Sequence, residues 1–305
     1  VLITPIVPGK INLDVAELSE RTAPADRPRV IHAALQAFAD ASQRDTLAWL
    51  AREGIPHRRF VVANVIAAQI PAGKMGALAQ RVSTLRIDPD PIVRQSLPKA
   101  EPHLFGKAVT AVEPGVTYIN ADDVWALPGN PRGAGVVIAG QDTGYRWTHA
   151  AIKAQYLGWN GVSADHNYAW HDAIHSGGGV CGPNSLAPCD DQGHGTHTMG
   201  TMVGDDSSTN QVGVAPAAKW IGCRNMDVGN GAPSTYLECF DWFLAPTDLN
   251  GQNPDPAKAP DVINNSWGCP TAEGCNSGNW ATMQTAVANL TAAGVLVVAS
   301  AGNSG

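Results

Sequence analysis

The chain has 305 residues, a formal net charge of −7, 44% hydrophobic residues and 15% charged residues, which is typical of a globular protein. Its acidic balance argues against a general nucleic-acid-binding protein. The longest apolar run, from Val295 to Ala299, is far shorter than the ~20 residues that a membrane-spanning helix needs. The length allows one large domain or two smaller domains.

The N-terminal region begins with a stretch punctuated by prolines, so we expect residues 1–26 to be irregular. Apolar side chains four and seven residues apart then predict a helix, and the residues on its apolar face are Ile31, Leu35 and Phe38. A second helix is expected from Thr46 to Arg52, after Asp45 as N-cap and before Gly54 as the C′ residue.

The following pattern predicts a strand over residues 59–70, a helix over 71–82 and a second strand over 85–93. We therefore expect a small α/β module over residues 27–95. It contains no cluster of side chains that suggests chemistry. The segment 96–118 is rich in proline and mixed charges, which predicts a linker, and a larger domain is expected over residues 119–305.

Two short apolar runs in the larger domain end in polar residues. The first begins at Gly135 and ends in Asp142-Thr143-Gly144, and the second begins at Gly294 and ends in Gly302-Asn303. Such runs are typical of strands buried in a parallel sheet. Because open α/β sheets build their sites at the carboxyl ends of strands, Asp142 and Asn303 are candidate site residues.

A third stretch lies between these two runs, from Asp191 to Thr201, and it contains Gly193-His194-Gly195-Thr196-His197. Glycine lets backbone segments approach each other closely. A neutral imidazole in such a place can accept a proton near neutral pH. An aspartate, a histidine and an amide donor in this layout suggest an acyl-transfer hydrolase.

Strands and helices alternate through the rest of the domain, which predicts a parallel sheet covered on both faces by helices. The further strands are expected at 219–223 and 262–265, and the further helices at 234–243 and 278–293.

The three stretches that contain Asp142, His194 and Asn303, in this order, resemble the subtilisin-like serine proteases, which are also called subtilases or the peptidase S8 family. A fourth stretch, Asn264-Asn265-Ser266-Trp267-Gly268, is similar to the bacillopeptidase F-like branch. The resemblance implies an α/β fold of three layers with a subtilisin-like parallel sheet, and it implies that the module at 27–95 is an inhibitory propeptide (inhibitor I9-like). The linker would then be a processing region.

The resemblance also implies roles for individual residues. Asp142 would orient the catalytic histidine, His194 would be the general base, and the Asn303 amide would stabilise the oxyanion. His194 is preferred to His197 because it matches the catalytic position of the Gly-His-Gly-Thr-His motif. The substrate backbone would lie along Gly229, Gly231, Ser266, Trp267 and Gly268, although Trp267 replaces a smaller aliphatic residue and a packing role is equally open.

The family's nucleophilic serine lies in a Gly-Thr-Ser-Met-Ala motif, which is absent from this sequence. We therefore expect a truncated, zymogen-like chain that holds a propeptide and the N-terminal part of a catalytic domain, with an incomplete sheet and no activity of its own. The parent protein is expected to be a secreted endopeptidase that acts on polypeptides, with its own propeptide as intramolecular inhibitor. The chemistry needs no cofactor, and the resemblance allows structural calcium.

All six cysteines lie in the larger domain, and they are Cys181, Cys189, Cys223, Cys239, Cys269 and Cys275. Their even number and their clustering suggest disulfides and an oxidising compartment. Pairing of neighbours along the sequence is one of fifteen connectivities that six cysteines allow.

Two alternatives to the protease remain open at this stage. One is a subtilase-like binding module without a nucleophile. The other is a metal hydrolase that uses His171 and His175 together with His194, because the first two are spaced i, i+4 and could bind a metal on one face of a helix. Solvent-exposed loop histidines are the favoured interpretation of His171 and His175.

Overall fold

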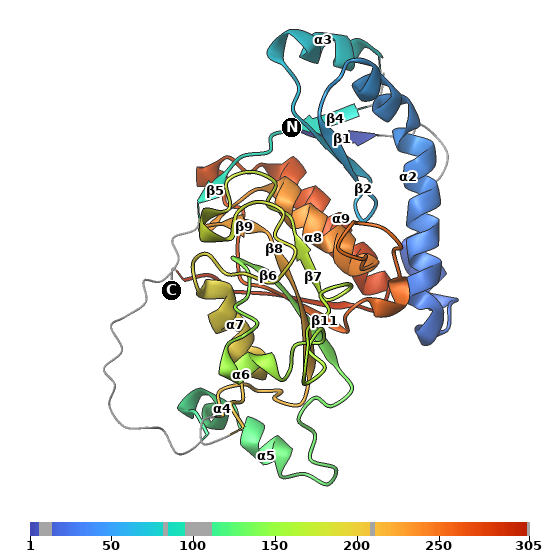
Figure 1. The fold of residues 1–305 in the computed structure, drawn as a ribbon. Helices are drawn as coiled ribbons and strands as arrows, with labels where there is room; N and C mark the ends of the chain where they lie inside the picture. Colours follow the sequence, from blue (N-terminus) through green and yellow to red (C-terminus); the bar gives the residue numbers. More distant parts are fainter. Residues whose placement is uncertain (6–13, 82–84, 95–111, 208–210, 304–305) are drawn as a thin grey trace.

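The computed structural model describes residues 1–5, 14–81, 85–94, 112–207 and 211–303. Figure 1 shows a parallel sheet with helices on both sides, and a smaller antiparallel sheet that packs beside it. We call the elements from β1 to β5 the N-terminal module and the elements from α4 to β12 the main domain. Among the described helices, none is both long and apolar enough to cross a membrane.

The main sheet has five strands in the order β12-β11-β6-β8-β7, and every neighbouring pair is parallel. The predicted α/β class with a parallel sheet is therefore confirmed. The strands are β6 (Val137–Asp142), β7 (Trp170–Asp172), β8 (Lys219–Arg224), β11 (Val262–Asn265) and β12 (Leu296–Ala299). Central β6 and β8 are almost completely buried, as expected for strands covered on both faces.

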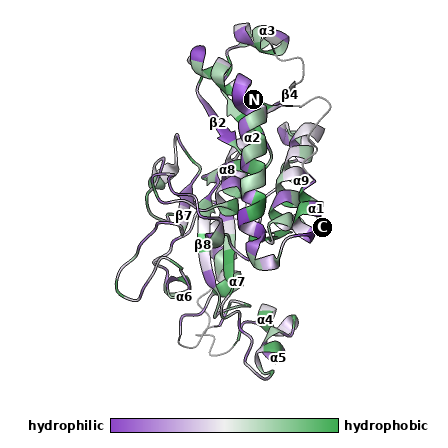
Figure 2. Cartoon of the chain, turned by 90° about the vertical axis from the view of Figure 1, so that its right-hand side faces the viewer, coloured by the Kyte–Doolittle hydropathy of each residue, from purple (hydrophilic) through white to green (hydrophobic). Residues whose placement is uncertain are grey.

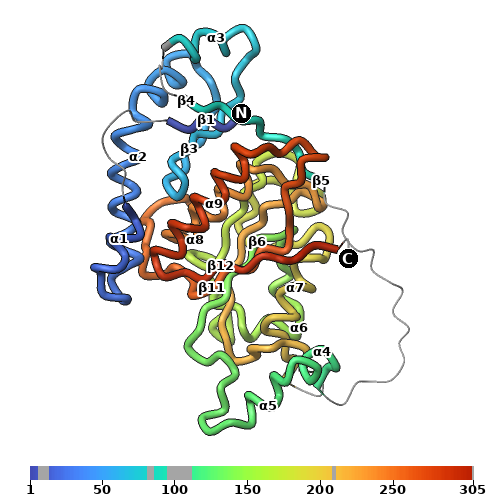
Figure 3. The backbone as a smooth tube through the Cα atoms, turned by 180° about the vertical axis from the view of Figure 1, so that it is seen from behind, coloured from blue at the N-terminus to red at the C-terminus, as the bar shows by residue number. Residues whose placement is uncertain are grey.

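Three helices cover this sheet: α7 (His194–Val203), α8 (Pro233–Leu244) and α9 (Ser277–Ala292). Figure 1 shows α8 and α9 on one side of the sheet and α7 on the other. Their apolar faces close a core with the strands, to which Trp220, Leu237, Phe240, Ile263 and Leu290 contribute. Figure 3 shows β12 followed by the segment that runs to the C-terminus.

The N-terminal module contains a four-stranded antiparallel sheet in the order β2-β3-β1-β4. Its strands are β1 (Leu2–Pro5), β2 (His57–Phe60), β3 (Val65–Ala68) and β4 (Leu85–Asp88). Its principal helices are α1 (Val15–Glu20), α2 (Arg27–Arg52) and α3 (Ala72–Arg81). The expected helix over 71–82 thus corresponds to α3.

Strand β1 corrects the expectation that residues 1–26 are irregular, because it lies inside the sheet between β3 and β4. Leu2 and Ile3 are both fully buried, and they belong to two different apolar clusters. Both faces of β1 are therefore covered, and a strand buried on both sides has no alternating pattern that would reveal it. Pro5 is tolerated because it pairs with β4 alone, beyond the residues of β1 that pair with β3.

The two helices expected before Gly54 are one continuous helix, α2, of 26 residues. No glycine or proline interrupts it after Pro28, so nothing in the chain ends it at Asp45. Figure 2 shows hydrophobic and hydrophilic colours alternating along α2, and its buried positions are Ile31, Leu35, Ala39, Gln43, Thr46, Trp49 and Leu50. Gly54 follows the helix with φ of 65°, as expected of a C′ glycine.

The single strand expected over 59–70 is the hairpin β2–β3, whose turn includes Asn64 with a positive φ of 51°. The strand expected over 85–93 is also divided. Pro89 and Pro91 separate β4 from β5 (Val93–Arg94), because proline cannot donate to a strand ladder. β5 leaves the small sheet and pairs with the main domain.

The remaining elements are short. They are η1 (Pro24–Asp26), α4 (Pro114–Tyr118), α5 (Ala121–Trp125), α6 (Ala150–Lys153), η2 (Gly179–Cys181), β9 (Met226–Asp227), β10 (Asn230–Gly231), η3 (Pro256–Lys258) and η4 (Thr271–Glu273). Most of the expected linker lies outside the described residues.

Candidate active site

Asp142 is the last residue of β6, at the carboxyl edge of the sheet, and its residue surface is only 1% exposed. Its Oδ1 atom accepts a hydrogen bond from the backbone N–H of Thr143 at 2.7 Å. Its Oδ2 atom accepts one from the Thr198 hydroxyl at 3.3 Å. The carboxylate is therefore held in one orientation by the strand end and by α7.

His194 is the first residue of α7, and its Nδ1 atom lies 2.7 Å from Oδ1 of Asp142. Because the carboxylate accepts, Nδ1 carries the proton, and the neutral ring keeps a lone pair on Nε2. Within the described residues, Nε2 has no hydrogen-bond partner. His197, the other histidine of the motif, is exposed.

Electrostatics favour a charged form of the His194 ring. The hydrogen bond to Asp142 raises the pKa of His194, partial burial opposes this effect, and the charges of Asp142 and Asp190 add to it. Burial raises the pKa of Asp142, and its hydrogen bond to His194 works against that rise. The pair can therefore stabilise an imidazolium after His194 has accepted a proton.

Glycine permits the close contact between the end of β6 and the start of α7. Gly144 has φ of 108°, and an added Cβ would lie 1.8 Å from the carbonyl oxygen of Cys189. An added Cβ on Gly195 would lie 2.1 Å from the carbonyl oxygen of Gly144. Larger residues at either position would push His194 away from Asp142.

The predicted substrate-binding glycines lie on the hairpin β9–β10. Gly229 has φ of 84° in the turn, and Gly231 lies in β10. β10 pairs antiparallel with β5 of the N-terminal module, with Gly231 opposite Val93 and Asn230 opposite Arg94. The structure thus places an extended segment of the same chain against this hairpin.

The second predicted substrate segment, Ser266 to Gly268, follows directly after β11. The Trp267 ring stacks on Tyr236 of α8, with ring centroids 3.9 Å apart. It also packs against a cluster that includes the fully buried Val93. Trp267 therefore has a packing role, and it lines the place where β5 lies.

Asn303 lies four residues after the end of β12 and is exposed. The described residues include no hydrogen bond from Asn303 to Asp142 or His194. The structure therefore brings together two of the three predicted catalytic residues, and the oxyanion role of Asn303 stays a prediction.

The helix on which the metal interpretation of His171 and His175 was based is not formed. His171 lies on β7 and His175 in the loop after it. Their Nε2 atoms lie 2.9 and 2.8 Å from Oε1 of Glu238, whereas His194 pairs with Asp142. In the described part of the chain, no three histidine, cysteine or acidic side chains are arranged to hold a metal ion.

Three disulfides stabilise the surroundings of the site, and each joins neighbours along the sequence: Cys181–Cys189, Cys223–Cys239 and Cys269–Cys275. The first ends one residue before Asp190, and the second links β8 to α8. Sequence reasoning missed Asp190 and Thr143, because the motif resemblance assigned no role to either residue.

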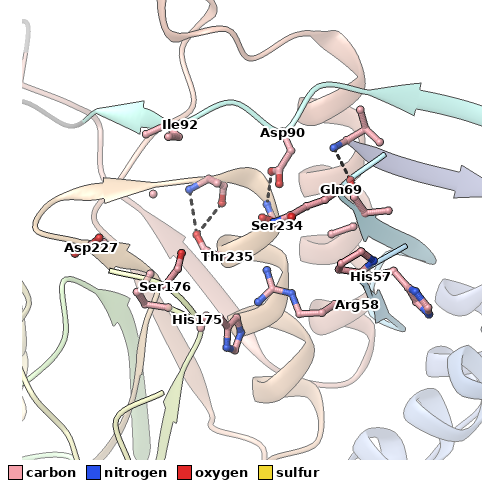
Figure 4. Close-up of a pocket in the computed structure, with 18 of the residues that line it drawn as sticks. His57, Arg58, Gln69, Asp90, Ile92, His175, Ser176, Asp227, Ser234 and Thr235 are labelled. Carbon is pink, nitrogen blue, oxygen red and sulfur yellow. Dashed lines mark hydrogen bonds between the residues drawn. The ribbon is translucent and has the colours of Figure 1, made fainter. Parts of the chain in front are cut away.

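A cavity of about 690 Å³ lies between the N-terminal module and the main domain. Figure 4 shows Arg58 and Gln69 of the N-terminal module among the residues that line it, and Asp90, which accepts a hydrogen bond from the backbone N–H of Ser234 at 2.9 Å. Neither Asp142 nor His194 lines this cavity. Asn230 and the predicted substrate-binding residue Gly231 do line it, so the cavity adjoins the β9–β10 hairpin, where β10 lies between β9 and β5.

The fold and the site define an α/β protein with a hydrogen-bonded Asp–His pair, whose Asp is buried, at the carboxyl edge of a parallel sheet. A family model described as the subtilase family matches residues 133–305. The chain belongs to the subtilase family, as its motifs predicted.

Two relatives illustrate the similarity. Bacillopeptidase F of Bacillus subtilis (strain 168) is 34% identical over 83% of this chain and 18% of its own length. The major intracellular serine protease of the same organism is 29% identical over 65% of this chain and 51% of its own. The chain thus spans about half or less of the length of these relatives.

Among solved structures, the fold is similar to an epidermin leader peptide processing serine protease from Staphylococcus aureus. The TM-score is 0.58 at 17% identity, with 86% of this chain and 59% of that chain covered.

Proposed function

We propose that the protein is a secreted subtilisin-like serine endopeptidase. The observation that carries this proposal is the 2.7 Å contact between His194 Nδ1 and Asp142 Oδ1 in a chain of the subtilase family. Asp142 fixes the tautomer of His194 and leaves Nε2 as the general base. Three disulfides support an oxidising compartment, and hence secretion.

In the proposed reaction, Nε2 of His194 takes the proton of a serine hydroxyl while the serine oxygen attacks the peptide carbonyl carbon. The Asn303 side-chain amide donates to the oxygen that becomes negative. The imidazolium then gives its proton to the leaving amine, and water hydrolyses the acyl-enzyme. Asp142 thus orients His194, and His194 accepts and returns one proton. This chemistry needs no cofactor.

We place the nucleophilic serine beyond Gly305. Support comes from the lack of a Gly-Thr-Ser motif within the 305 residues. The chain also spans only 18% and 51% of its two relatives. On this proposal residues 1–305 are the zymogen-like N-terminal portion of the enzyme.

The substrate is proposed to bind as an extended strand beside β10. Support comes from β5, whose backbone already pairs with this edge in an antiparallel ladder. Such strand addition gives affinity through main-chain hydrogen bonds and specificity through side-chain pockets. Val93 of β5 is fully buried among Met226, Tyr236 and Trp267, so an apolar side chain suits this place.

We further propose that the N-terminal module is an intramolecular inhibitor. Besides the β5–β10 pairing, it docks on the helices α8 and α9. The Asp241 carboxylate accepts backbone N–H groups of Val61 and Val62 at 2.6 Å each, and the Asn289 amide donates to the Val62 carbonyl at 2.7 Å. This module would therefore cover the groove until the chain is processed.

The test of the function uses the full-length protein, with casein as substrate. We expect hydrolysis that His194→Ala reduces by at least about 10⁴-fold. His197→Ala is the matched control, because His197 is the exposed histidine of the same motif, and it should retain activity. Activity that a chelator abolishes and that survives His194→Ala would instead indicate a metal hydrolase, and a folded, processed protein without activity would indicate a binding module.

A further inference from the structure

The helix that presents His194 has no N-cap side chain of its own. Its N-cap residue is Gly193, with φ of 98°, and no side chain of this residue can satisfy the free N–H groups of the first turn. Unpaired N–H groups at a helix start leave a partial positive charge there and need acceptors. Another part of the chain must therefore supply them.

Gln192 Oε1 accepts the backbone N–H of His194 at 2.8 Å, and Asp190 binds the backbone before and after His194. Its Oδ1 atom accepts the backbone N–H groups of Gly193 at 2.7 Å and Gln192 at 3.1 Å. Its Oδ2 atom accepts the backbone N–H of Thr196 at 2.9 Å and the Thr196 hydroxyl at 2.5 Å. One carboxylate thus binds the chain on both sides of His194.

The same carboxylate also holds the end of β6. The Thr143 hydroxyl donates to Asp190 Oδ1 at 2.8 Å, and it accepts the backbone N–H of Gly195 at 3.0 Å. Thr143 directly follows Asp142, and Gly195 directly follows His194. Asp190 and Thr143 therefore form a direct link between the residues next to each member of the pair.

We propose that Asp190 is a positioning residue for the Asp142–His194 pair: it sets the distance between β6 and α7 and places a second negative charge near the His194 ring. This inference rests on the proposed function. Asp190 acts through the pair, because its oxygens are bound to backbone and threonine groups. The charge effect agrees with the contribution of Asp190 to the raised pKa of His194.

Three variants separate geometry from charge. Asp190→Asn removes the charge and brings an NH₂ group toward N–H donors. Asp190→Glu keeps the charge but changes its reach. Thr143→Val keeps the charge and the side-chain shape but breaks the link to Asp190 and Gly195. Asp248→Asn is the control, because Asp248 also accepts two backbone N–H groups, from Asn250 and Gln252, in a separate turn.

Two readouts on the full-length protein test the proposal. The first is the pH dependence of diethyl pyrocarbonate modification at His194, followed by peptide mass spectrometry, since only the neutral ring reacts. The second is steady-state kinetics on a peptide substrate. For Asp190→Asn we expect the pH midpoint of His194 modification to move to lower pH. We also expect kcat to fall about 10- to 100-fold with little change in KM, because the groove is untouched.

Compared with Asp190→Asn, Asp190→Glu should bring the pH midpoint of His194 modification closer to the wild-type value, but it should recover less of kcat. Thr143→Val should lower kcat, and it should move the midpoint less than Asp190→Asn does. A wild-type midpoint and a wild-type kcat in folded Asp190→Asn would overturn the proposal. If that variant does not fold, an unchanged kcat in folded Thr143→Val would overturn it as well. If the wild-type protein is inactive, the midpoint shift still decides the role of Asp190, and only the proposed function fails.

Discussion

Nδ1 of His194 lies 2.7 Å from Oδ1 of Asp142, although 52 positions separate the two residues in the sequence. The contact exists because a strand end and a helix start meet at one edge of the parallel sheet, and because glycines at 144 and 195 leave room for both backbones. The chemistry proposed for this protein depends on this contact.

Asp142→Asn should lower kcat by about 10⁴-fold, because the amide favours the wrong tautomer of His194. The wild-type hydrogen bond raises the pKa of His194, and the ring must be neutral to act as a base. Activity of the wild type should therefore rise with pH through a midpoint above about 6.5, the ordinary value for histidine. The residual activity of Asp142→Asn should rise at lower pH. A pH profile of kcat/KM for each protein measures both midpoints. The same midpoint in the wild type and in Asp142→Asn would contradict the role of Asp142 as the partner of His194.

Gly144→Ala should destabilise the main domain by more than about 3 kcal/mol, because strain at a positive φ is combined with a clash against the Cys189 carbonyl. Gly135→Ala is the matched control. Gly135 also has a positive φ, 86°, but no atom lies within 4 Å of an added Cβ, so its cost should be about 1–2 kcal/mol. Chemical denaturation compares the two variants, and equal losses would show that the space around Gly144 is unimportant.

Asp241→Ala should loosen the N-terminal module, because it removes the acceptor of two backbone N–H groups in the β2–β3 turn. The expected loss is about 3 kcal/mol of docking free energy. Hydrogen exchange of the peptide that contains Val61 and Val62 should become faster in the full-length protein. Asp241→Asn keeps one acceptor oxygen and should behave more like the wild type, so identical exchange in Asp241→Ala would count against this contact.

Val93→Asp should free the groove beside β10 and make proteolytic activity appear sooner after synthesis, because it places a carboxylate in a fully buried apolar site. Ile92→Asp is the adjacent control, since Ile92 is 65% exposed. A time course of substrate hydrolysis by the two full-length variants measures the difference. Equal delays would mean that β5 does not restrict access to the groove.

Much of the main domain could be predicted from local pattern. β6 and β12 lie in apolar runs bounded by glycine or polar residues, and α7 begins at a glycine-flanked histidine. Parallel strands align their carboxyl ends, so Asp142 and the start of α7 were expected at one edge. The motif order then predicted the family, which the family model over residues 133–305 confirms.

The rest depends on contacts between distant segments. β1 is too short and too evenly buried to show a strand period, and β5 exists only because β10 lies beside it. His171 and His175 share Glu238 through a strand and a loop, which helical spacing could not reveal. Asp190 binds groups on both sides of His194, and its role becomes visible only when the loop is folded.

Labelling the full-length protein with a fluorophosphonate, and mapping the labelled residue by mass spectrometry, would show directly whether a serine is the nucleophile. We predict one labelled serine beyond Gly305, with labelling lost in His194→Ala and retained in His197→Ala. A label on a serine within residues 1–305 would contradict the assignment of the nucleophile. No label on the folded, processed protein would contradict the claim that it is a serine protease.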